Sequence, residues 1–160
     1  MTAFVPVLAA AATVAAVSDV RRRRIPNALC GALAIAGVVN AGITGGIVGI
    51  GVGLALLAAV LAVGTVAFAR GWFGGGDVKL IAAGCCGLAP AYAADFVLYT
   101  ALCGGLLSLY ALASQRVLVA AMITRTLPQT GTRLPYAVAV AGGALLLWVA
   151  LLCPAYLLVR

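Results

Sequence analysis

The sequence is poor in acidic residues and has no histidine. Its 160 residues contain no glutamate, and the only acidic side chains are those of Asp19, Asp77 and Asp95. Without histidine, an imidazole base and histidine-containing metal sites are excluded. Any acid–base chemistry must therefore draw on these three carboxyl groups.

Charged side chains of both signs are also scarce. They make up 8% of the chain, 66% of the residues are hydrophobic, and the mean hydropathy is +1.23. An ordinary soluble domain is about one quarter charged. The apolar runs continue along the whole length and lack the alternating polarity of membrane strands. We therefore predict an all-α, polytopic membrane helix bundle that forms a single domain over residues 1–160.

The five cysteines form no C-x-x-C pair. They are Cys30, Cys85, Cys86, Cys103 and Cys153, and most lie within apolar segments. A free thiol in such a setting behaves as a small hydrophobic side chain. We therefore expect no metal site and no cofactor.

The formal net charge of +7 reflects basic residues that lie between the apolar runs. No aromatic platform accompanies them, so we expect the lipid bilayer and not a nucleic acid as the partner. If the amino terminus is outside, nine of the ten basic side chains fall on the cytoplasmic side, in agreement with the positive-inside tendency. This topology places Asp19 and Asp77 on the cytoplasmic side and Asp95 on the opposite side.

Polar residues, glycine and proline interrupt the apolar runs and divide the chain into about six predicted transmembrane segments. The first five ranges are Thr2–Val17, Asn27–Val39, Ile47–Ala69, Val78–Leu88 and Phe96–Ala113. The sixth segment begins after Leu134-Pro135-Tyr136 and runs to about Leu152 or beyond. A tight turn is expected at Asn40–Gly46, and a short interfacial helix at Val117–Ile123.

Small residues recur every fourth position in the third segment, as Gly45, Gly49 and Gly53. Such a stripe lets helices approach closely in lipid. We expect it to serve packing within the bundle, although a contact in a homo-oligomer is left open.

Asp19 and Asp77 together suggest catalysis, because a carboxylate at the membrane edge is costly to keep. If they meet, one could take a proton from water while the other donates a proton to a scissile carbonyl oxygen. Alternatively, Asp19 pairs with its neighbouring arginines and Asp77 caps a helix that begins at Val78. We expect Asp95 to cap the fifth segment. The residues alone leave the choice for the first two open.

Three motifs resemble those of type IV prepilin peptidases. Ser18-Asp19 followed by Arg21–Arg24 and Ile25-Pro26-Asn27 is similar to the family's first aspartate motif. The stretch Gly74-Gly75-Gly76-Asp77-Val78-Lys79 resembles the family's G-x-G-D motif, and Leu134-Pro135-Tyr136 a later one. The resemblance implies a membrane aspartic endopeptidase with Asp19 and Asp77 as the catalytic pair. Gly74, Gly75, Gly76 and Lys79 would support the loop and the substrate.

The same resemblance implies a substrate and a location. The protein would remove the leader peptide of type IV prepilins at the cytoplasmic face of the bacterial inner membrane. It looks most like the small peptidases of tight-adherence (Flp) pili, since the extension that carries methyltransferase activity is not seen. The alternatives are a preflagellin-type archaeal peptidase and a non-enzymatic subunit of a pilus or secretion complex. Presenilin-like proteases are disfavoured, because they carry a Tyr-Asp pair where Ser18-Asp19 stands.

Overall fold

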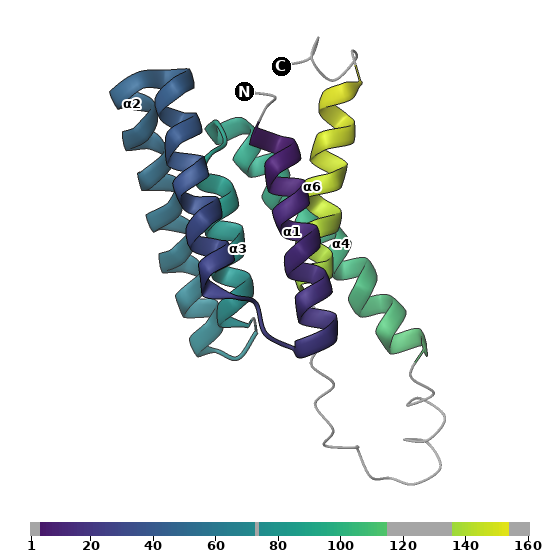
Figure 1. Cartoon of the computed structure of the whole chain (residues 1–160). Helices are drawn as coiled ribbons and strands as arrows, with labels where there is room; N and C mark the ends of the chain where they lie inside the picture. Colours follow the sequence, from purple (N-terminus) through teal and green to yellow (C-terminus); the bar gives the residue numbers. More distant parts are fainter. Residues whose placement is uncertain (1–3, 73, 115–135, 154–160) are drawn as a thin grey trace, which may run out of the picture.

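The computed structural model describes residues 4–72, 74–114 and 136–153 (Figure 1). Within these ranges the chain forms only helices. They are α1 (Phe4–Arg22), α2 (Asn27–Ala69), α3 (Gly75–Cys86), α4 (Pro90–Ser114) and α6 (Tyr136–Leu152). The predicted all-α bundle is confirmed, whereas the predicted interfacial helix at Val117–Ile123 lies outside the described residues.

Helix α2 folds back on itself as a hairpin of two arms (Figure 1). Its 43 residues would extend about 65 Å as a straight rod, roughly twice the thickness of a bilayer core. The chain reverses at Gly46, whose φ of 59° and ψ of −147° are accessible essentially to glycine alone. The predicted turn at Asn40–Gly46 is therefore wrong in extent. Helical structure continues to Gly45, and a single glycine makes the reversal.

Two predicted helix ends also differ from the structure. The first segment was expected to end at Val17, but α1 continues to Arg22. Arginine in the last turn favours this continuation, because a positive charge complements the carboxyl end of the helix dipole. Helix α4 begins at Pro90 and not at Phe96. Proline fits the first turn of a helix, where its missing N–H has no helical partner to lose.

The predicted count of about six spans is not reached. Among the described residues, α1, α2 and α4 are long and apolar enough to cross a membrane, and α6 is a shorter apolar helix. Helix α2 is counted as one of these three long helices, although the chain reverses within it at Gly46. Helix α3 has 12 residues. It is about 18 Å long, too short for a hydrocarbon core of about 30 Å.

The short helix α3 packs against the α2 hairpin, while α6 packs against both α1 and α4. Two glycines in the second arm of α2 lie against α3. A Cβ added to Gly53 would collide with the Cys86 carbonyl oxygen, and a Cβ added to Gly64 would collide with the Val78 side chain. The second arm therefore contacts both the backbone and the side chains of α3. Gly49 lies equally close to Ala41 of the first arm. For Gly49 and Gly53, the predicted use of the glycine stripe in packing within the bundle is confirmed.

The core lies between α1, α3, α4 and α6. Its largest fully buried side chains are Phe96, Leu8, Leu80, Leu147, Val5 and Val140. Helix α1 runs antiparallel to α3, because the Phe4 ring packs against Gly87 and the Leu8 side chain packs against Gly84. The carboxyl end of α1 is thereby directed toward the amino end of α3.

Candidate active site

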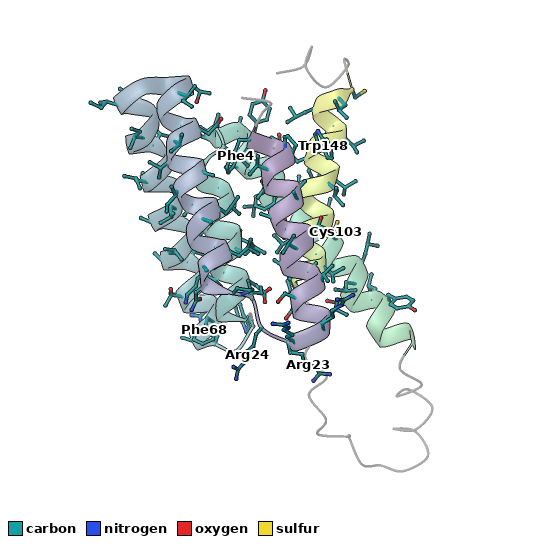
Figure 2. All side chains as sticks on the ribbon, viewed as in Figure 1. Phe4, Arg23, Arg24, Phe68, Cys103 and Trp148 are labelled. Atoms are coloured by element: carbon teal, nitrogen blue, oxygen red, sulfur yellow. The ribbon has the colours of Figure 1, made fainter. Side chains whose placement is uncertain are left out.

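The two predicted catalytic carboxyl groups lie at the same end of the bundle. Asp19 is in the last turn of α1, and Asp77 is in the first turn of the antiparallel helix α3. They are close enough for the charge of Asp19 to raise the pKa of Asp77. Figure 2 shows Arg23, Arg24 and Phe68 at this end, and Phe4 and Trp148 at the other. The structure thus brings together the pair that the sequence predicts.

Asp77 is buried, with 8% of its surface exposed. Its Oδ1 atom has no hydrogen-bond partner in the part of the chain that the structure describes. Burial, followed by the charge of Asp19, raises the pKa of this carboxyl from 3.8 to about 6, while a backbone hydrogen bond from Gly74 acts in the opposite direction. Asp77 can therefore hold a proton close to neutral pH, as a proton donor requires.

Asp77 is not the N-cap residue of α3. The helix begins at Gly75 and not at Val78, and its cap residue is Gly74. The N–H group of Asp77 donates to the Gly74 carbonyl oxygen at 3.1 Å, as in a first helical turn. The alternative of Asp77 as the cap of a helix that begins at Val78 is therefore wrong in position, although the backbone hydrogen bond from Gly74 to its carboxyl is one that acidic residues make in a first turn. Neither this bond nor the helix dipole accounts for the buried Oδ1 atom, which has no partner among the described residues.

Asp19 is half-buried, and the turn that follows it is held by backbone interactions. The N–H group of Arg23 donates to the Asp19 carbonyl oxygen at 2.7 Å, and the Ser18 hydroxyl donates to the Arg24 carbonyl oxygen at 2.9 Å. Arg23 adopts a φ of 49°, a left-handed conformation that ends the helix. These bonds fix the direction in which the chain leaves Asp19.

Asp95 is not part of this arrangement. It lies within α4, one turn beyond the start at Pro90, so the prediction that it caps the fifth segment is wrong. The adjacent Phe96 ring packs against Gly84, near the end of α3 that is remote from Asp77. Of the three acidic residues, only Asp19 and Asp77 form a pair.

The three glycines before Asp77 are approached closely from three sides. A Cβ on Gly74 would lie 2.7 Å from Oδ2 of Asp77, one on Gly75 3.4 Å from the Phe68 ring, and one on Gly76 3.2 Å from the Ile25 side chain. The glycines therefore let the protein's own side chains pack closely at the start of α3, whose first two residues are Gly75 and Gly76.

Lys79 is exposed, and its Nζ donates to the Oδ1 atom of Asn27 at 3.1 Å. The sequence prediction gave Lys79 a supporting role but assigned none to Asn27 or Ile25. The sequence could have indicated both residues, because they belong to the Ile25-Pro26-Asn27 stretch on which the resemblance to the first aspartate motif rests.

A groove of about 220 Å³ runs between the α2 arms and α3. Asn27 and Lys79 are its polar residues, and apolar side chains such as Leu57 and Leu61 line the rest. The groove is therefore polar near the carboxyl pair and apolar beyond it.

These features define a multi-pass helical membrane protein that brings two carboxyl groups together at one end of its bundle. Residues 6–109 match the model of the type IV leader peptidase family. The chain belongs to this family, and the match includes both Asp19 and Asp77. It ends before the Leu134-Pro135-Tyr136 stretch. Searches of curated proteins and of solved structures found no match to the chain.

Proposed function

We propose that the protein is an aspartic-type endopeptidase that removes the leader peptides of type IV prepilins. The observation that carries the proposal is the buried carboxyl of Asp77, whose pKa rises to about 6 beside Asp19. Two neighbouring carboxyl groups with separated pKa values can divide acid and base roles between them. The resemblance of the motifs to those of Flp-type peptidases supports an Flp-like prepilin as the substrate.

In the proposed reaction, Asp77 begins protonated and Asp19 begins ionised. Asp19 accepts a proton from a water molecule, and the water oxygen attacks the carbonyl carbon of the scissile peptide bond. Asp77 donates its proton to the carbonyl oxygen, which gives a neutral tetrahedral intermediate. Asp19, now protonated, gives its proton to the leaving nitrogen, and the ionised Asp77 takes a proton from a hydroxyl of the intermediate as the C–N bond breaks, which releases the acid and amine products and restores both aspartates. The half-buried position of Asp19 suits the base, since it can reach water.

The site would face the cytoplasm of a bacterial inner membrane. Arg21, Arg22, Arg23, Arg24, Arg70 and Lys79 cluster at helix ends near the carboxyl pair. Because cytoplasmic loops carry an excess of basic residues, this end of the bundle is the better candidate for the cytoplasmic side. Trp72, 66% exposed with Arg70 5.3 Å from its ring, suits the membrane interface.

The test is cleavage of a purified Flp-type prepilin by the purified protein in detergent, with the new amino terminus identified by mass spectrometry. Asp19→Asn and Asp77→Asn should each lower the rate at least about a thousandfold while leaving membrane insertion intact. Asp95→Asn is the matched control and should cleave at nearly the wild-type rate. Normal cleavage by either of the first two variants would exclude the proposed pair. A wild-type protein that cannot cleave alone would favour a non-enzymatic subunit.

A further inference from the structure

Two contacts join the linker between α1 and α2, and the first residue of α2, to the first turns of α3. The Nζ of Lys79 donates to Oδ1 of Asn27, across 52 positions of sequence, and the Ile25 side chain packs against Gly76. Each contact joins a residue near Asp19 in the sequence to a residue adjacent to or near Asp77. We name these four residues, Ile25, Asn27, Gly76 and Lys79, the linker clamp.

The linker itself has little freedom. Helix α1 ends at Arg22 and α2 begins at Asn27, so only four residues separate them. Pro26 holds its φ at −63°, and the Ser18 hydroxyl bonds to the Arg24 carbonyl oxygen across the turn. Whatever fixes Asn27 relative to α3 therefore also restrains the last turn of α1, where Asp19 lies.

We propose that Asn27 and Lys79 are positioning residues that set the separation of the Asp19 and Asp77 carboxyl groups through the linker clamp. The inference rests on the proposed peptidase function and adds a role for two residues that take no part in its proton transfers. A displacement of about 1 Å at a catalytic group can cost about a hundredfold in rate. The coupling between two carboxyl groups also weakens as their distance grows.

Charged and titratable groups from three elements act on this pair. Asp19 on α1 lies within electrostatic reach of Asp77, and Cys30 on α2 lies within electrostatic reach of both Asp77 and Lys79. Asp19 is the neighbour that raises the pKa of Asp77. A clamp that loosens should therefore lower the apparent pKa of the pair's acidic member, and this readout differs from a simple loss of stability.

The variants for the test are Asn27→Leu, Lys79→Met, the double variant and Asn27→Asp. Asn27→Leu and Lys79→Met should each lower kcat about ten- to hundredfold with a smaller change in KM. The double variant should be no slower than the slower single variant, because both changes break the same hydrogen bond. Asn27→Asp keeps an acceptor for Lys79 and should restore most of the rate. The basic limb of the pH–rate profile should move to lower pH in Asn27→Leu, a change that leaves the charges near the pair unaltered.

The matched control is Asn40→Leu. The Nδ2 of Asn40 donates to the Gly87 carbonyl oxygen at 2.9 Å, so this variant removes another α2–α3 hydrogen bond, at the end remote from the carboxyl pair. It should lower thermal stability and leave the pH–rate profile unchanged.

Two results would overturn the linker clamp. One is wild-type kcat in Asn27→Leu, and the other is full additivity of the two single variants, which would show that Lys79 acts separately from Asn27. If the wild type cleaves and Asp77→Asn does not, either result rejects the clamp alone. If Asp77→Asn cleaves normally, the proposed catalytic pair fails, and the linker clamp fails with it.

Discussion

Replacing Asp77 with asparagine should stabilise the folded protein above about pH 6 while abolishing cleavage. The pKa of Asp77 is raised by burial and by Asp19, so the folded state binds its proton more tightly than the unfolded state does. As pH rises from about 4 through 6, the unfolded state releases this proton first and the wild type loses stability. Asparagine has a similar shape and does not titrate, so the variant escapes the loss.

The magnitude follows from the size of the shift. A rise from 3.8 to about 6 corresponds to about 3 kcal/mol, at about 1.4 kcal/mol for each pKa unit. Water at the membrane edge screens part of the interaction with Asp19, so we expect a gain of about 1–3 kcal/mol at about pH 8. At about pH 4 most of this difference should vanish, because the folded carboxyl is then protonated and the pH is close to the unfolded pKa of 3.8, where the unfolded state has only begun to release its proton. Asp19→Asn should give a smaller gain at about pH 8, since it removes only the second cause of the shift.

The assay is thermal unfolding in detergent, followed by circular dichroism at several pH values for the wild type and both variants. For a protein of this size, 1 kcal/mol corresponds to a change in Tm of about 2–4 °C. A gain for Asp77→Asn that is equal at about pH 4 and pH 8 would refute the reasoning, because it would not depend on the ionisation of Asp77. A loss of stability at about pH 8 would refute it as well.

Three further changes test other parts of the structure. The rate of prepilin cleavage should fall as pH rises through about 6, where Asp77 loses its proton; a pH–rate profile measured at saturating substrate checks this. Gly87→Ala should lower stability by about 1–3 kcal/mol, because its Cβ would collide with the Phe4 ring, whereas Gly31→Ala has open space and should be neutral or slightly stabilising in thermal unfolding. Thr100→Val should raise stability by about 1 kcal/mol in the same assay, since the buried Thr100 hydroxyl has no hydrogen-bond partner in the described residues.

The fold class could be predicted because it depends on composition. Long apolar runs with few charges leave helices as the only spanning element, and Pro26 marks the start of α2 at Asn27 correctly. Helix ends were harder to predict. Arg21 and Arg22 are polar and suggest the end of a membrane segment, yet a helix can continue beyond the apolar core while its side chains reach water. Hydropathy locates the apolar part of a helix and not the last helical residue.

The scarcity of acidic residues and the predicted topology singled out Asp19 and Asp77 as candidates. Their assignment as a catalytic pair came from the resemblance of their motifs to those of type IV prepilin peptidases. The burial of Asp77 could not be predicted, because it depends on how Gly74 and the rest of the loop pack. The contact of Ile25 with Gly76 likewise joins positions far apart in the sequence, and no periodicity reports such a contact.

The short helix α3 explains why α2 carries an asparagine near each end of its first arm. A helix that cannot cross the bilayer must have its polar ends satisfied by protein, since lipid offers no hydrogen bonds. Asn40 donates to the Gly87 carbonyl oxygen just beyond the carboxyl end of α3, and Asn27 accepts from Lys79 near the amino end. The first arm of α2 therefore holds α3 at both ends. Because Asp77 lies two residues before Lys79 in α3, the contact that supports this end of α3 would, in the proposed clamp, also restrain the position of the buried carboxyl.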